Sequence, residues 1–232
     1  MEEKRITPFA GFTPQTISFL RELKENNNKQ WFEEHRTIYE NELLHPFRAL
    51  IGMISPAMYS IDPRFEMRPN RILSRIYRDI RFSQNKDPYK SSMWMSFQRS
   101  GTQWEYFPGY FMELNTEDCC YGLGLFMPKR KVMDRFREEV EFQPESFREM
   151  MEKKVLQRGF VIEGEKYKRP LPINLPDMYQ QWIQRKNFYV IKTLPLNDER
   201  IYSEALALLL MDDFTQLADL YHFLVEITEE TE

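Results

Sequence analysis

The chain has 232 residues, of which 42% are hydrophobic and 15% aromatic, enough to build a sizeable core in one large domain or two small ones. Its formal net charge of −4 argues against a protein that coats nucleic acid through bulk charge. Because there are only eight glycines, long flexible linkers and low-complexity tracts are not expected.

Cysteine usage and the N-terminal sequence predict the compartment. Cys119 and Cys120 are the only cysteines, and as neighbours they suit neither a structural disulfide nor a CxxC motif. Residues 1–9 lack the apolar core of a signal peptide, and no uncharged apolar run reaches about 18 residues. We therefore expect a soluble, cytoplasmic protein without a membrane partner.

The first sixty residues carry helix signals. Thr13 followed by Pro14 is typical of a helix start, with a capping hydroxyl and a proline in the first turn. The three asparagines at 26–28 break that helix and can cap the next. Pro46 should kink or split the second helix, and Pro56 should end it.

The middle of the chain is rich in strand-forming residues. Strands are expected at 72–82, 93–99, 103–114 and 119–127. The short gaps between them favour an antiparallel meander, with a bend at Pro108-Gly109 inside the third strand.

After Pro128 the apolar spacing becomes helical again, interrupted by short strands at 160–163 and 188–194. Helices are expected at 132–140, 147–151, 177–186, 198–211 and 213–225. The order of elements predicts an α+β fold, with a central antiparallel β-meander packed against N-terminal and C-terminal helices. Without an internal repeat or linker, we expect a short tail at 1–6, a single domain at 7–226 and an acidic tail at 227–232.

Charge is concentrated in one segment. Residues 64–90 hold eight basic and three acidic residues, a net charge of +5, whereas the remainder of the chain is at −9. A locally positive strip on an acidic body favours a small anion over an extended polyanion.

Alternation along 72–82 assigns side chains to the two faces of the expected strand. Arg78 shares its face with Ile76 and Ile80, so it should be buried and would need a carboxylate or a ligand as partner. Arg75 and Arg81 fall on the opposite face, and arginine is well suited to bind phosphate or carboxylate.

The expected ligand-binding residues are therefore the cations and one hydroxyl of this strand and the following turn: Arg75, Arg78, Arg81, Lys86, Tyr89 and Lys90. Asp79 either orients the arginines or acts as a general acid or base. The alternative is structural: the arginines form an ion-pair ladder with Asp79 or with carboxylates such as Glu105 and Glu113.

Other chemistry has weaker signals. His35, His45 and His222 are isolated and lack zinc-ligand spacing, so neither a metal nor a cofactor is predicted. No base is visible beside the cysteines that could activate a nucleophile. Gly122 and Gly124 lie on one face of a strand, where they would leave room for a helix or a ligand packed over the sheet.

Several blocks resemble one bacterial and fungal family, the domain of unknown function 2461. They are Phe9–Phe12, Phe19-Leu20 with Asn26-Asn27 and Trp31-Phe32, Arg75–Asp79 with Arg81–Ser83, Lys86 with Pro88–Lys90, Pro108–Tyr110, Gly122–Gly124 and Glu163–Pro170. The resemblance extends from about Thr7 to about Leu224 and implies a single α+β domain of unassigned activity, with no catalytic residue to carry over. The chain departs from the family pattern at Asn85, where the family has an acidic residue, at Lys29, where it has arginine, and at Pro170–Pro172.

Three classes of function remain open at this stage. In the first, the protein binds a small phosphorylated or carboxylated ligand through the Arg/Lys-rich segment, as an enzyme or as a sensor. In the second, it is a nucleic-acid or phosphoprotein binding module, which the acidic remainder disfavours. In the third, it is a scaffold with no small ligand. The sequence does not indicate an oligomeric state.

Overall fold

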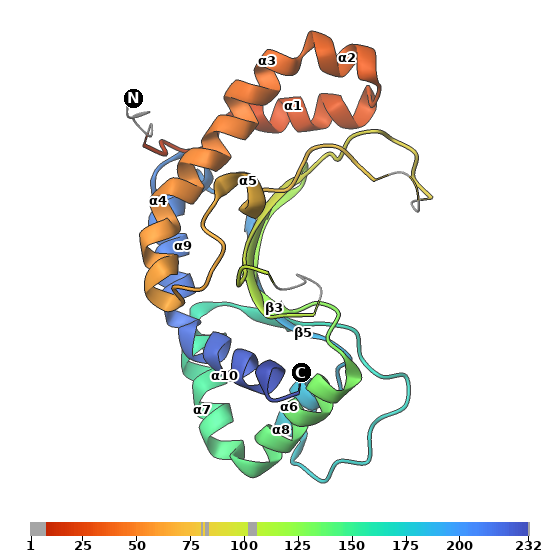
Figure 1. Cartoon of the computed structure of the whole chain (residues 1–232), viewed down its shortest axis with the longest axis vertical. Helices are drawn as coiled ribbons and strands as arrows, with labels where there is room; N and C mark the ends of the chain where they lie inside the picture. The colour runs from red at the N-terminus through yellow and green to blue at the C-terminus, as the bar shows by residue number, and fades with distance from the viewer. Residues whose placement is uncertain (1–7, 80, 82–83, 102–105, 232) are drawn as a thin grey trace. The chain divides into compact units, whose positions relative to one another are not determined.

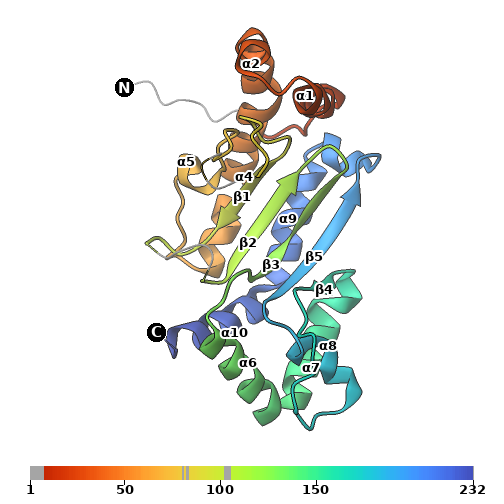
Figure 2. The ribbon, with the colours of Figure 1, turned by 90° about the vertical axis from the view of Figure 1, so that its right-hand side faces the viewer.

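The structure, a computed structural model, describes residues 8–79, 81, 84–101 and 106–231. Its sheet consists of β1 (Met93–Phe97), β2 (Gly109–Leu114), β3 (Asp118–Leu125), β4 (Val161–Glu163) and β5 (Phe188–Pro195). The strands are antiparallel in the order β1-β2-β3-β5-β4, so β1 to β3 form the expected meander (Figure 2). The predicted α+β class is confirmed. Of the strand expected at 103–114, residues 103–105 lie outside the described residues, and β2 begins only at Gly109, so the bend expected inside this strand at Pro108-Gly109 is wrong.

The chain divides into two compact units. The N-terminal unit holds the chain up to Ser96, together with Met112–Cys120 and Thr193–Asp212, and the C-terminal unit holds the rest. By these bounds, β1, β2, β3 and β5 each have residues in both units.

We expect the described chain to unfold in one cooperative transition, as a single domain would. The reason is covalent continuity: melting either unit would break four strands that continue into the other. Urea unfolding followed by far-ultraviolet circular dichroism and by tryptophan fluorescence should give coincident curves. Two separated transitions would contradict the single-domain prediction.

In the N-terminal unit, α1 (Pro14–Glu25) starts where predicted. Thr13 and Thr16 exchange side-chain and backbone hydrogen bonds in a capping box, and Pro14 occupies the first turn. Asn28 caps α2 (Lys29–Glu34) by accepting from the backbone N–H of Trp31 at 3.0 Å. A short α3 (Arg36–Ile38) follows.

The disruption expected at Pro46 takes the form of a π-helix, η1 (Tyr39–Leu44), which leads into α4 (His45–Ile61). Pro46 has no N–H to offer the carbonyl of Glu42. That carbonyl instead accepts from Thr16 Oγ1 at 2.8 Å, and Thr13 Oγ1 donates to the Glu42 carboxylate at 2.6 Å. The cap of α1 thus compensates for the bond that the proline removes.

The prediction that Pro56 ends this helix is wrong, because α4 continues through Pro56 to Ile61. The missing N–H costs one helical bond. Ile54, Met58 and Ile61 are all buried along the same helix, and this burial outweighs the local penalty. Figures 1 and 2 show α4 on one face of the sheet, beside the first part of α9 (Ala205–Gln216).

In the C-terminal unit, helix α6 (Arg130–Phe142) contacts three helices. They are α7 (Pro144–Lys154), α8 (Asp177–Ile183) and α10 (Ala218–Glu229). Phe147 is central to their packing, with ring centroids 5.6 Å from Phe136, 5.1 Å from Trp182 and 5.3 Å from Phe223. Helix α10 extends past residue 226, with Ile227 and Thr228 buried.

The predicted boundary between the last two helices is also wrong. A 3-10 turn, η3 (Glu199–Tyr202), precedes α9, and Asp213 lies inside α9 instead of starting the next helix. A second 3-10 turn, η2 (Leu156–Arg158), leads to β4.

Gly122 and Gly124 of β3 allow neither a helix nor a ligand to approach; they allow the neighbouring strand to do so. A Cβ added at Gly122 would lie 1.9 Å from the carbonyl oxygen of Val190, and one at Gly124 would lie 2.2 Å from Cβ of Tyr189. The predicted role for these glycines is therefore corrected to close approach by β5.

Candidate anion-binding site

The described part of the segment expected to be a strand at 72–82 is not a regular strand. Residues Pro69–Ile72 form a helical turn, α5, with the proline in its first turn. Beyond it, Leu73 makes an isolated antiparallel bridge with Met95, and Tyr77 makes one with Tyr89. Ile80, Phe82 and Ser83, which the strand prediction includes, lie outside the described residues.

Two short stretches, 76–78 and 88–90, pair with each other and are called the basic arm below. The backbone N–H of Arg78 donates to the carbonyl of Pro88 at 2.9 Å, and that of Lys90 donates to Ile76 at 2.8 Å. Because paired extended residues alternate between faces, Tyr77 and Tyr89 share one face, and Ile76, Arg78 and Lys90 share the other.

Asn27 fixes the position of the arm. Its side-chain amide donates to the carbonyl of Tyr89 and accepts from the Tyr89 N–H, both at 3.0 Å, in the manner of a neighbouring strand. The Tyr89 ring stacks on Phe32 with centroids 4.2 Å apart and is 2% exposed. Burial raises the pKa of the Tyr89 hydroxyl, and the nearby Tyr77 raises it further. Tyr89 is thus part of the aromatic packing against α2.

Arg78 and Lys90 lie together on the other face. Arg78 is half-buried, and its Nη2 donates to the Tyr89 carbonyl at 3.5 Å, which directs the guanidinium toward the strand that carries Lys90. The Nε of Arg78 is buried without a hydrogen-bond partner in the described part of the protein. The predicted pairing of Arg78 with a protein carboxylate is therefore not observed among these residues.

Lys90 is half-buried, with its Nζ 6.0 Å from the centroid of the Trp94 ring. Burial lowers the pKa of its ammonium group, and the charges of Arg75 and Arg78 lower it further, against a smaller opposing effect of Glu113. Arg75 is exposed. The charges of Arg75 and Arg78 thus both act on Lys90, and no ion pair joins any of the three to a carboxylate within residues 8–79, 81, 84–101 and 106–231.

Two other predicted site residues pair with each other. Arg81 donates to Asp79 through Nε at 3.0 Å and Nη2 at 2.6 Å, and both side chains are exposed. These bonds lower the pKa of Asp79 to about 2, so that it is ionised at neutral pH. This geometry does not favour Asp79 as a proton donor, and it makes Asp79 a weak base. Lys86 is exposed in the turn. Glu105 lies outside the described residues.

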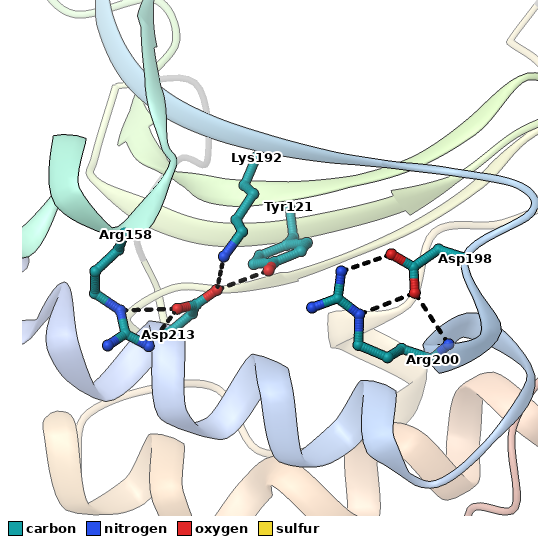
Figure 3. Close-up of polar contacts among 6 residues, drawn as sticks. All are labelled: Tyr121, Arg158, Lys192, Asp198, Arg200 and Asp213. Carbon is teal, nitrogen blue, oxygen red and sulfur yellow. Dashed lines mark hydrogen bonds and ion pairs between the residues drawn. The ribbon is translucent and has the colours of Figure 1, made fainter.

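A second charged cluster, which the sequence analysis missed, lies in the C-terminal unit (Figure 3). The carboxylate of Asp213 is fully buried in α9. It accepts from Arg158 Nε at 2.9 Å and Nη2 at 2.7 Å, from Lys192 Nζ at 3.0 Å and from the Tyr121 hydroxyl at 2.7 Å. The cluster pairs two cations with one anion, and each of its four residues comes from a different element. The same figure shows Arg200 paired locally with Asp198 in the N-terminal unit.

The cysteines are poor candidates for a nucleophile. Cys119 is buried and Cys120 half-buried, and both are free thiols. Burial raises the pKa of the Cys120 thiol to about 12, with a further contribution from Glu113, so little thiolate forms at neutral pH.

Among the described residues, no group of three or more His, Cys, Asp or Glu side chains could hold a metal ion. In that same part, no helix has the length and apolar character needed to cross a bilayer.

The structure defines the chain as an α+β protein, with Arg78 and Lys90 on one face of a clamped two-stranded arm. Residues 15–223 match the model of the family described as conserved hypothetical protein (DUF2461). The chain belongs to that family, as its sequence blocks predict. A comparison with curated proteins finds no match. The family description assigns no activity, so the function must be argued from the site.

Proposed function

We propose that this protein binds the phosphate or carboxylate group of a small ligand through Arg75, Arg78 and Lys90. The buried Nε of Arg78 is the observation that carries the proposal. A buried donor without a partner costs free energy that a charged acceptor would recover. An anion at this position would also offset the repulsion among the three cations.

The proposal gives secondary roles to the remaining predicted residues. Arg81 and Lys86 are exposed and would form the outer rim, where an incoming anion competes with Asp79 for Arg81. Tyr89 would support the arm through its packing on Phe32. A small ligand is favoured over nucleic acid because the segment at +5 is confined to 64–90, and the remainder of the chain is at −9.

We also propose a cytoplasmic location, where small phosphorylated and carboxylated compounds would be available. The two free thiols support this proposal, because secreted proteins usually oxidise their cysteines. Fractionation of cells that express the full chain tests it, and recovery outside the cytoplasm would contradict it.

The ligand proposal is tested by thermal unfolding of the full chain in inorganic phosphate, sulfate or citrate, with chloride at matched ionic strength as reference. Binding to the folded state alone should raise the melting temperature progressively with anion concentration. Arg75→Ala with Lys90→Met should abolish this rise. Arg68→Ala is the matched control, since Arg68 is an exposed arginine of the same basic segment that pairs with Glu66. Equal anion responses in wild type and the double variant would contradict the proposal.

The variant Arg78→Met distinguishes an anion-binding role of Arg78 from a purely structural role in a buried ion pair. If Arg78 is a ligand-binding cation without a protein carboxylate, its removal should leave the stability of the ligand-free protein unchanged within about 1 kcal/mol, or increase it, because repulsion of Lys90 is relieved. The anion response should still disappear. A loss of about 3–5 kcal/mol without added anion would instead indicate a buried ion pair broken by the substitution.

A further inference from the structure

We infer that Lys90 is a nucleophilic amine, which forms an imine with the carbonyl group of a small aldehyde or ketone that also carries a phosphate or carboxylate. This inference rests on the proposed function, since Arg75 and Arg78 would bind the anionic group of the same molecule. It adds a reacting residue and a chemical class of ligand to that site.

The position of Lys90 supports this role. Its backbone is held on both sides, by its own N–H bond to Ile76 and by the Asn27 clamp on the preceding residue, Tyr89. Diagonal neighbours on one face of paired strands lie within reach of long side chains, and Arg78 is the diagonal neighbour of Lys90. The ligand's anionic group at Arg78 would therefore bring its carbonyl carbon close to the amine.

The electrostatic environment of Lys90 supports nucleophilicity. An amine attacks a carbonyl only in its neutral form, and desolvation together with neighbouring cations increases the share of that form. Lys90 is half-buried, the charges of Arg75 and Arg78 act on it, and within the described residues no carboxylate bonds to it. The Trp94 ring, with its centroid 6.0 Å from Nζ, acts in the opposite direction, because a ring face stabilises the ammonium form. The charged groups acting on it are Arg75 and Arg78 from its own segment and Glu113 from β2.

The chemical step needs no further reactant. The Lys90 ammonium first loses a proton to water, and the amine lone pair then forms a bond to the carbonyl carbon. The two protons of the amine pass through water to the former carbonyl oxygen, the C–O bond breaks, and a water molecule leaves. The product is a C=N bond to Lys90, which takes up one proton from water when the imine is protonated. The positive charge of a protonated imine would occupy the place of the former ammonium group, beside the bound anion.

Pyridoxal 5′-phosphate is a suitable probe because it carries an aldehyde and a phosphate on one small molecule. The full chain is incubated with it at neutral pH, reduced with sodium borohydride, digested and analysed by mass spectrometry. We expect labelling concentrated at Lys90, saturable with probe concentration and suppressed by inorganic phosphate. Pyridoxal, which lacks the phosphate, should label Lys90 less. Glyoxylate, reduced in the same way, tests a carboxylate in place of the phosphate.

Two variants make the test specific. Lys90→Arg keeps the charge but cannot form an imine, so it should retain stabilisation by inorganic phosphate and lose the label. Lys29→Met is the matched control, because Lys29 is an exposed lysine of the same unit that has no part in the proposed site, and this variant should retain the label at Lys90. Labelling spread over exposed lysines and insensitive to phosphate would overturn the inference. If phosphate still stabilises the wild-type protein in that case, the proposed function stands alone; if it does not, both proposals fall.

Discussion

Asp213→Asn is expected to cost about 3–5 kcal/mol of unfolding free energy, because it removes the buried carboxylate that two cations and one hydroxyl share. Asp213 is fully buried and accepts from Arg158, Lys192 and Tyr121. An asparagine of the same shape has one acceptor oxygen for three donating groups, and its own amide would face the cations. The side chains of Arg158 and Lys192 are 28% and 21% exposed, so water can reach them, and the lower end of the range is expected.

An exposed aspartate of the next helix provides the control. Asp219 lies in the first turn of α10 with its carboxylate 3.9 Å from Lys154, and Asp219→Asn makes the same chemical change with an expected effect within about 1 kcal/mol. Both variants are compared by urea unfolding monitored by circular dichroism. Equal stability of the two would show that the Asp213 cluster contributes little. Adding Lys192→Met to Asp213→Asn should recover part of the loss, because a cation that bonds to Asp213 in the wild type is then removed.

Local signals predicted the fold where they act within a few residues. Thr13 and Pro14 start α1 because the cap and the first turn depend only on neighbours in sequence. The prediction that Pro56 ends the helix failed because it used local information alone. The proline does remove a helical hydrogen bond, but the burial of Met58 and Ile61, which keeps α4 helical, depends on the rest of the unit. A sequence of strand-forming residues at 72–82 likewise did not specify a strand, since a strand also needs a partner along its length.

The basic site was partly predictable for a related reason. Alternation placed Ile76 and Arg78 on one face and Tyr77 on the other, and this holds where 76–78 pairs with 88–90. The sequence could not show that Asn27 clamps the arm, because that contact joins residues 62 positions apart.

The Asp213 cluster was missed, although one signal was present. Leu206, Leu210 and Asp213 follow at helical spacing, so the carboxylate falls on the buried stripe of α9. A charge on a core face needs partners, which is the argument applied to Arg78. Its partners could not be named, because Tyr121 and Arg158 come from elements whose pairing only the fold determines.

Gly122→Ala should cost about 3 kcal/mol, the upper end of the usual range for overpacking, because the added methyl group would meet backbone that cannot move alone. A Cβ at Gly122 would lie 1.9 Å from the carbonyl oxygen of Val190 in β5. Gly101→Ala is the contrasting control: its φ of +84° is unfavourable for alanine, but within the described part of the chain no atom, those of its chain neighbours aside, lies within 4 Å of the added Cβ. Its cost should be that of the backbone conformation, about 1 kcal/mol.

Urea unfolding of both variants measures the difference, and equal costs would show that β5 shifts away from β3 with little penalty. Such a shift would have a second consequence. Tyr121 precedes Gly122 on β3, and Lys192 lies on β5, and both bond to Asp213. If Gly122→Ala separates these strands, it weakens the buried cluster as well. The double variant with Asp213→Asn should then lose less unfolding free energy than the two single variants lose together. Full additivity would instead show that the close approach of β5 and the ion cluster stabilise the C-terminal unit independently.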